Sequence, residues 1–164
     1  MSSSVIAVFP GTFDPITLGH EDLIRRGAGM FASVVVAVAT AHHKKTVFSL
    51  DERLVMVREV FMDVPNVRVE PFTGLVTEFV KTQGAQLMLR GVRSVTDFDY
   101  ESQLAGMNRL LLPQVDTVFL TADSRWQSIS STLVREISTL GGDVAQFVAP
   151  PVLARLMQKR AASA

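Results

Sequence analysis

A chain of 164 residues lies within the size range of a single domain and can bury about two thirds of the surface that it exposes when unfolded. Hydrophobic residues make up 48% of it and charged residues 20%, which excludes an intrinsically disordered protein. Sixteen basic and sixteen acidic side chains cancel, so no global field drives binding to nucleic acid or to an anionic membrane, and any anion site has to be local.

The start of the chain and the cysteine content bear on the compartment. The segment MSSSVIAVFPG (1–11) has no basic stretch and only a five-residue apolar run before proline, which argues against a secretion signal and a membrane span. The absence of cysteine excludes disulfides and thiolate metal sites. We therefore expect a cytoplasmic protein with one domain over residues 1–164, whose short polar ends at 1–4 and 161–164 are flexible.

Short runs rich in β-branched residues predict the strands of a sheet. In chain order these runs are VIAVF (5–9), SVVVAVA (33–39), VRVEPF (67–72), QLMLR (86–90) and DTVFLTA (116–122). Three of them are nearly continuous apolar runs, which is typical of strands that are covered on both faces.

Segments with helical spacing alternate with these strands. One helix begins after Ser49, because Ser49 and Glu52 form a capping box, and Leu54, Val57 and Phe61 then recur on one face. Other helices are predicted over 18–31, 74–83, 97–111, 131–140 and 151–160. The alternation predicts a single-domain, Rossmann-like α/β fold, in which a doubly wound, five-stranded parallel sheet carries helices on both faces.

Polar clusters follow the strands at four points along the chain. They are PGTFDPITLGH (10–20), TAHHKK (40–45), RGVR (90–93) and DSRWQSISST (123–132). In a parallel sheet these clusters meet at one edge. The converging side chains are His20, Lys44, Lys45, Arg90 and Arg93, with the hydroxyls of Thr12, Thr17, Ser130, Ser131 and Thr132. So many cations and hydrogen-bond donors predict a site for a polyphosphate nucleotide.

Other phosphate chemistries lack their motifs. The chain has no GxxxxGK[ST] loop, no GxSxG elbow and no structural-zinc spacing, and the GAG at 27–29 lies inside a predicted helix. Taken singly, each polar cluster is also consistent with a helix cap, a solvated loop or a surface turn. Their convergence at one edge of the sheet favours a site.

The polar clusters also carry a family resemblance. PGTFDPITLGH contains Thr17-Leu18-Gly19-His20, which resembles the TxGH form of the signature of HxGH-type nucleotidyltransferases. With RGVRSVTDFDYESQLAGMNR (90–109) and ISST (129–132) in the same order, nearly the whole chain closely resembles the bacterial phosphopantetheine adenylyltransferase family. The resemblance implies that ATP and 4′-phosphopantetheine give dephospho-coenzyme A and pyrophosphate, the penultimate step of coenzyme A biosynthesis.

The resemblance also implies roles for individual residues. His20, Lys44 and Arg93 are expected to be catalytic, with His20 stabilising the pentacovalent transition state at the α-phosphate. The implied ATP contacts are Thr12, Phe13, Gly19, His20, Gly91, Val92, Arg93, Glu101, Trp126, Gln127, Ser128, Ile129, Ser130, Ser131 and Thr132. The implied acceptor contacts are Thr12, Lys44, Leu75, Val76, Arg90, Leu104, Met107 and Asn108.

Cofactors and assembly follow from the same resemblance. Mg²⁺ is expected to arrive with ATP, since no protein-only metal site is recognisable in the sequence. The family implies a homohexamer and feedback inhibition by coenzyme A. No general base is expected, because the acceptor phosphate has a second pKa of about 6 and is already mostly dianionic.

Some positions depart from the family pattern. Many members carry other residues at Gln127, Ser128 and Thr132, and the loss of an aromatic side chain at Ser128 changes the packing expected around the nucleotide. Val76 stands where a longer side chain is common, which widens the expected acceptor pocket. The roles of His42, His43 and Lys45 stay open.

Two alternatives remain. The first is a superfamily member with nicotinate mononucleotide or glycerol 3-phosphate as acceptor, which the stretch 97–108 disfavours. The second is a non-catalytic nucleotide-binding regulator, which the intact His20, Lys44 and Arg90 disfavour.

Overall fold

The computed structural model describes residues 4–41 and 45–163 and confirms the predicted α/β architecture. The strands are β1 (Ile6–Gly11), β2 (Ser33–Ala39), β3 (Val67–Phe72), β4 (Leu87–Val92) and β5 (Asp116–Thr121). The helices are α1 (Leu18–Met30), α2 (Leu50–Val60), α3 (Val76–Thr82), α4 (Val95–Leu111), α5 (Ser131–Thr139) and α6 (Pro150–Ser163). Every predicted strand and helix is present.

Several helix boundaries differ from the prediction by one to three residues. Helix α4 begins at Val95 rather than at residue 97, because the hydroxyl of Ser94 accepts a hydrogen bond from the amide of Asp97 and caps the helix. Helix α6 continues to Ser163 rather than ending at residue 160, so the segment 161–163, for which the sequence predicts a flexible end, forms its last turn.

The strands form one parallel sheet in the order β3-β2-β1-β4-β5. From β1 the chain first builds outward through β2 and β3, and then crosses back to build β4 and β5 on the other side of β1. The direction of winding therefore reverses between β1 and β4. In doubly wound sheets, ligands bind at the carboxyl ends of the strands beside such a switch point.

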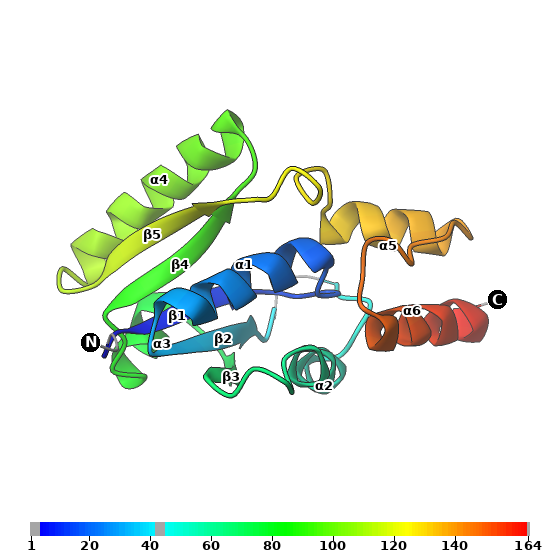
Figure 1. Ribbon diagram of the computed structural model, residues 1–164, viewed down its shortest axis with the longest axis horizontal. Coiled ribbons are helices and arrows are strands. Elements are labelled where there is room, and N and C mark those ends of the chain that lie inside the picture. The colour runs from blue at the N-terminus through cyan, green and yellow to red at the C-terminus, as the bar shows by residue number, and fades with distance from the viewer. Residues whose placement is uncertain (1–3, 42–44, 164) are drawn as a thin grey trace.

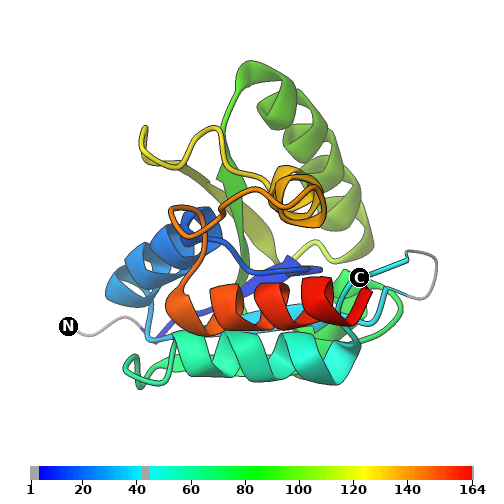
Figure 2. The same cartoon turned by 90° about the vertical axis from the view of Figure 1, so that its right-hand side faces the viewer.

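Helices cover both faces of the sheet, as Figures 1 and 2 show. Alternate residues of β2 belong to different cores: Val36 packs with α1, α2 and α6, whereas Val35 packs with α3 and with the segment that follows α4. Val35 lies beside Val8 of β1, which in turn lies beside Met88 of β4. Burial on both faces explains why these strands read as continuous apolar runs.

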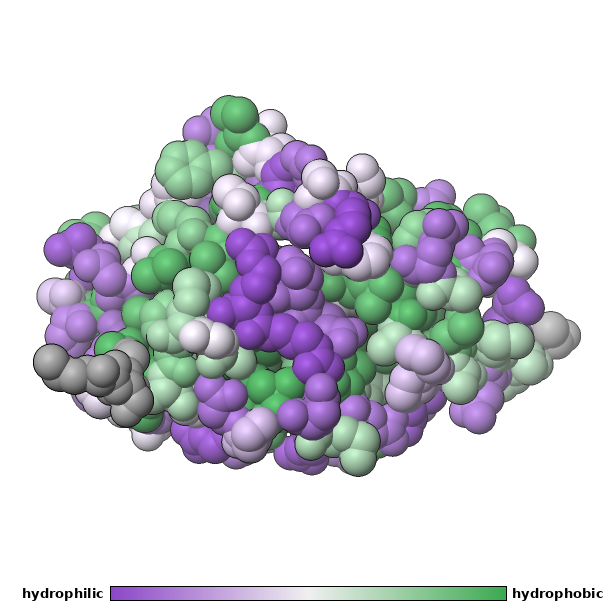
Figure 3. All heavy atoms as spheres, in the orientation of Figure 1, coloured by the Kyte–Doolittle hydropathy of each residue, from purple (hydrophilic) through white to green (hydrophobic). Residues whose placement is uncertain are grey.

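The helices that border the sheet are amphipathic. The predicted core residues Leu54 and Val57 of α2 and Phe61, which follows it as the C-cap, are buried, and the capping box of Ser49 and Glu52 is formed. The solvent face of α1 is strongly polar, with ion pairs between residues four positions apart across its middle, and it forms the hydrophilic centre of the face in Figure 3. Among residues 4–41 and 45–163, no helix has both the length and the apolar content that crossing a membrane requires.

A buried arginine ties the carboxyl ends of β1 and β2 to the start of α2. Arg53 is only 1% exposed, and its Nη1 donates to the carbonyls of Thr12 at 2.8 Å and Ala39 at 2.7 Å. Its Nε donates to the carbonyl of Phe48, whose amide donates in turn to the buried carboxylate of Asp14. These bonds hold the loop after β1, and with it Thr12, in a fixed place at the edge of the sheet.

Candidate active site

His20 is fixed at the first turn of α1 by an unusual capping box. The amide of Thr17 donates to His20 Nδ1 at 3.1 Å, and the hydroxyl of Thr17 accepts from the amide of His20. Histidine thus takes the place of the glutamate that usually completes such a box. Because Nδ1 accepts the Thr17 amide proton, the neutral ring carries its own proton on Nε2, which is left as the donor of the ring.

The surroundings of His20 keep its ring uncharged. Burial is the main cause, and the positive charges of Arg93 and Arg90 add to it, so that the pKa of His20 falls from its ordinary 6.5 to about 4. The ring also packs edge-on against Phe13, with 5.2 Å between the ring centroids. At neutral pH the side chain is therefore a neutral hydrogen-bond donor that stands beside two cations.

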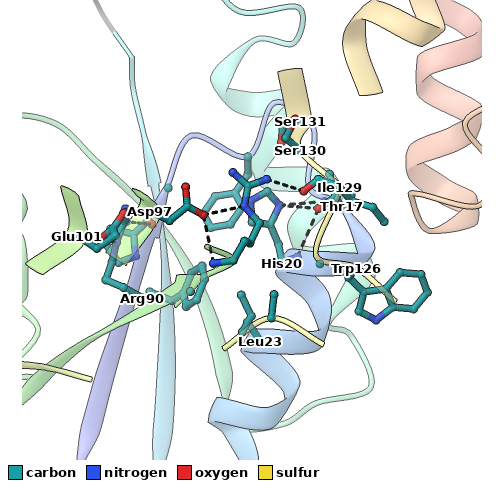
Figure 4. A pocket seen from close by; sticks show the side chains of 18 residues that line it. Thr17, His20, Leu23, Arg90, Asp97, Glu101, Trp126, Ile129, Ser130 and Ser131 are labelled. Atoms are coloured by element: carbon teal, nitrogen blue, oxygen red, sulfur yellow. Dashed lines mark hydrogen bonds and ion pairs between the residues drawn. The ribbon is translucent and has the colours of Figure 1, made fainter. Parts of the chain in front are cut away.

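A cavity of about 300 Å³ opens in front of His20 (Figure 4). Its walls come from the loops after β1, β4 and β5 and from the first turns of α1 and α5, which bring helix N-termini to the cavity. Residues predicted to contact ATP line much of it: Phe13, Gly19, His20, Gly91, Arg93, Glu101, Trp126, Ile129, Ser130 and Ser131. The structure thus brings together side chains that lie more than a hundred positions apart in the sequence.

Arg93 is held over this cavity from two sides. The carboxylate of Asp97 accepts from both the backbone amide and the Nε of Arg93, at 3.2 and 3.1 Å. On the other side, Nη1 of Arg93 donates to the carbonyl of Ile129 at 2.9 Å. Sequence reasoning missed Asp97, although the pattern of a serine followed three residues later by an acidic residue marks it as the first turn of α4.

Arg90 is paired with Glu101 in a two-pronged ion pair. Nη2 of Arg90 lies 2.6 Å from Oε1 of Glu101, and Nε lies 2.7 Å from Oε2. The remaining Nη1 donates to the carbonyl of Pro10 at 3.0 Å. Such bidentate pairs are among the strongest hydrogen-bonded contacts in proteins, so the guanidinium is rigidly oriented before any ligand binds.

A second cavity, of about 330 Å³, lies on the other side of this ion pair. Its lining is more apolar and includes predicted acceptor contacts, namely Thr12, Val76, Arg90, Leu104 and Asn108. The two cavities share Pro10, Gly11, Arg90 and Glu101. A ligand in one cavity therefore lies directly beside a ligand in the other.

Other predicted contacts lie elsewhere. Val92 is buried, and Gln127, Ser128 and Thr132 are exposed and line neither cavity. Leu75 and Met107 point largely to solvent, with exposed fractions of 59% and 60%. Lys44, His42 and His43 lie outside the described residues, and Lys45 is exposed.

The glycine and the serines near the first cavity have structural partners. A Cβ at Gly91 would overlap the side chain of Leu23, so this glycine lets α1 pack closely on β4. The hydroxyl of Ser130 caps α5 by accepting from the amide of Leu133. The hydroxyl of Ser131 donates to the carbonyl of Pro15 at 2.7 Å. The Ser131 bond thus fixes the start of α5 against the loop after β1, whereas the Ser130 bond fixes the first turn of α5 itself.

Sequence comparison gives close relatives over nearly the whole chain. The profile of the cytidylyltransferase-like family matches residues 8–137. The phosphopantetheine adenylyltransferase of Acidovorax sp. strain JS42 is 68% identical over 155 residues, which cover 94% of either chain. The protein of the same name from Thiobacillus denitrificans is 56% identical over 153 residues, which cover 93% of this chain and 96% of the relative.

Solved structures share the fold at low identity. The nicotinic acid mononucleotide adenylyltransferase of Plasmodium falciparum has a TM-score of 0.68 and 12% identity, with 94% of this chain and 95% of that chain covered. A bifunctional NMN adenylyltransferase/ADP ribose pyrophosphatase from Francisella tularensis has a TM-score of 0.74 and 15% identity, with 94% and 49% covered. The high identity to the curated relatives shows that the chain belongs to the phosphopantetheine adenylyltransferase family, a family of nucleotidyltransferase enzymes.

Proposed function

We propose that the protein transfers the adenylyl group of ATP to 4′-phosphopantetheine and releases dephospho-coenzyme A and pyrophosphate. The observation that carries this proposal is the pair of adjoining cavities: one presents His20 and Arg93, the other is more apolar, and Arg90 lies between them. Two substrates, one a polyphosphate and one with a long organic arm, need such a pair of sites. Family membership favours the same reaction.

The proposed chemistry is a single displacement at the α-phosphorus. ATP lies in the first cavity, and the phosphate of the acceptor reaches the α-phosphate from the second. A bond forms between an acceptor phosphate oxygen and the α-phosphorus while the bond to the bridging oxygen breaks, and the electron pair leaves with pyrophosphate. No proton has to be removed from the acceptor, because its second pKa of about 6 leaves it mostly dianionic at neutral pH.

The side chains of the site then act by position and charge. His20 donates its Nε2–H to an α-phosphate oxygen as negative charge develops there, and its low pKa keeps it in the neutral form that the capping box requires. Arg93 and Arg90 offset the repulsion between the two anions. In this proposal Thr12, Arg90 and Lys44 hold the acceptor phosphate, while Val76, Leu104 and Asn108 line its organic arm.

Magnesium is proposed to enter with the triphosphate. The carboxylates in the first cavity, Asp97 and Glu101, are each ion-paired with an arginine. Within the described ranges, no three histidine, aspartate or glutamate side chains gather into a metal site. ATP phosphate oxygens are the proposed ligands of the magnesium ion.

Assembly, regulation and location are proposed on the family's pattern. A homohexamer would give α4 a partner for its exposed apolar side chains, among them Tyr100, Leu110 and Leu111. Six copies of a 17.9-kDa chain have a mass of about 107 kDa, which light scattering on the purified protein would test. Coenzyme A, which extends the acceptor chemistry, is proposed to compete for the second cavity, and the proposed location is the cytoplasm.

The reaction is tested by pyrophosphate release from ATP and Mg²⁺ with one acceptor at a time. The acceptors are 4′-phosphopantetheine, nicotinate mononucleotide and glycerol 3-phosphate. Release with phosphopantetheine alone is the expected result. Release with another acceptor alone would keep the chemistry and overturn the substrate, and ATP binding without release with any acceptor would support a binding regulator instead.

A further inference from the structure

The loops that follow β4 and β5 are joined by two hydrogen bonds that run in opposite directions. Nε2 of Gln127 donates to the backbone carbonyl of Arg93 at 2.6 Å, and Nη1 of Arg93 donates to the carbonyl of Ile129 at 2.9 Å. We call this pair of bonds the Gln127 clasp. It connects residues that lie 34 and 36 positions apart in the sequence, beside the first cavity, which Arg93 and Ile129 line.

The clasp completes the fixation of Arg93. The carboxylate of Asp97 already holds the backbone amide and the Nε of this residue, while the clasp holds its carbonyl and its Nη1. Within the described part of the chain, Nη2 makes no hydrogen bond with protein, and Arg93 lines the cavity. The arginine is thus fixed at both backbone and side chain, and its last nitrogen is left for a ligand.

Gln127 itself is exposed and does not line the cavity, although the family resemblance places it among the ATP contacts. Its side-chain amide is directed instead at the neighbouring loop. We propose that Gln127 is a positioning residue: it orients Arg93 for the nucleotide phosphates through the Arg93 carbonyl and does not touch the nucleotide. This proposal rests on the proposed function for the identity of the ligand.

The physical basis is preorganisation. An arginine side chain loses considerable rotamer freedom when it is fixed on a phosphate, and a site in which it is already fixed has less to lose on binding. Removing one hydrogen bond of this kind shifts an equilibrium by about three- to tenfold. The expected effect of losing the Gln127 bond of the clasp is therefore an ATP dissociation constant about three to ten times higher.

The test uses Gln127→Met, which keeps the length of the side chain and removes its donor, in the full chain. Gln114→Met is the matched control, since Gln114 is also an exposed glutamine in a loop next to β5. The first readout is amide hydrogen exchange of the ligand-free protein in residues 91–97, the segment to which the Gln127 side chain is bonded. The second is the dissociation constant for ATP by calorimetry, and the third is the KM for phosphopantetheine.

The expected result for Gln127→Met is faster exchange in 91–97 without nucleotide, ATP binding about three- to tenfold weaker, and an acceptor KM within about twofold of wild type. The control should match wild type in all three readouts. Unchanged exchange together with weaker ATP binding would make Gln127 a direct nucleotide contact and overturn the proposal. Faster exchange with unchanged ATP binding, or no change at all, would overturn it as well.

A failure of the proposed function is distinguishable from a failure of this inference. Exchange in the ligand-free protein and calorimetric binding of ATP require no acceptor and no turnover. If the wild-type protein binds ATP but releases no pyrophosphate with phosphopantetheine, the proposed acceptor is wrong, while the first two readouts still decide the role of Gln127.

Discussion

The ionisation of His20 gives the most specific prediction of the structure. The ring is held between the Thr17 cap and Phe13, and burial with two neighbouring guanidinium groups lowers its pKa from 6.5 to about 4. At about 1.4 kcal/mol per pKa unit, this difference corresponds to about 3 kcal/mol between the folded and unfolded chains. This is a substantial fraction of the roughly 5–15 kcal/mol by which a typical domain is stable.

The direction of the pH effect follows from which state takes up the proton. Between pH 6.5 and about 4 the unfolded chain protonates His20 and the folded chain does not. The free energy of unfolding therefore falls as the pH drops through this window, and the contribution of His20 is constant above it. Carboxylates titrate in the same range, so the effect has to be isolated by comparison with a variant.

The assay combines NMR with urea unfolding. A pH titration followed in carbon–proton correlation spectra should show one imidazole ring that titrates near pH 4, and its signal should be missing in His20→Ala. Urea unfolding between pH 7 and 4.5 should show that the wild type loses up to about 3 kcal/mol more stability than His20→Ala. A His20 ring that titrates near 6.5, or equal pH dependence in both proteins, would refute the described surroundings of the ring.

Three further substitutions test the account. His20→Ala should lower kcat by about two to three orders of magnitude and leave the calorimetric ATP affinity within about twofold, because the histidine donor acts mainly in the transition state. Near-normal turnover would show that His20 is not catalytic. Arg90→Met should raise the KM for phosphopantetheine about tenfold or more, whereas the control Arg160→Met, at an exposed position, should not. Equal KM values in the two variants would show that Arg90 does not bind the acceptor phosphate. Arg53→Met should lower the free energy of unfolding in urea by about 3 kcal/mol, because it leaves buried carbonyls without donors. A decrease no greater than that of Arg68→Met, at an exposed position, would contradict the role of Arg53.

The fold was predictable because its strands are buried on both faces. Runs such as SVVVAVA (33–39) have no polar residue between apolar ones, and in an alternating chain this pattern leads to a parallel sheet. Strand order then brings the ends of β1, β4 and β5 together. The convergence of His20, Arg93 and Ser130 on one cavity follows from this topology alone.

The partners of the charged residues were not predictable in the same way. The ion pair of Arg90 with Glu101 depends on how α4 packs against β4, which no local pattern specifies. Arg53 is a charged residue in an amphipathic helix, and its sequence position gives no sign that four backbone carbonyls surround it in the core. Hydrogen-bond acceptors on the backbone are invisible in a sequence, so burial of such an arginine emerges only from the structure.

Family resemblance also does not fix side-chain direction. Leu75 and Met107 were expected in the acceptor pocket and point mainly to solvent in the single chain. Gln127 was expected on ATP and contacts the loop of Arg93. A motif locates a segment at the site, whereas the direction of each side chain depends on the turn that the segment makes.

The most direct test of the proposed displacement is the stereochemical course at the α-phosphorus. ATP with a sulfur in place of one α-phosphate oxygen, of a single configuration, is turned over with phosphopantetheine, and the configuration of the product is determined. A direct attack from the second cavity, beside His20 and Arg90, predicts inversion. Retention would require a covalent adenylyl-enzyme and two displacements, and would contradict the proposed direct transfer between the two cavities.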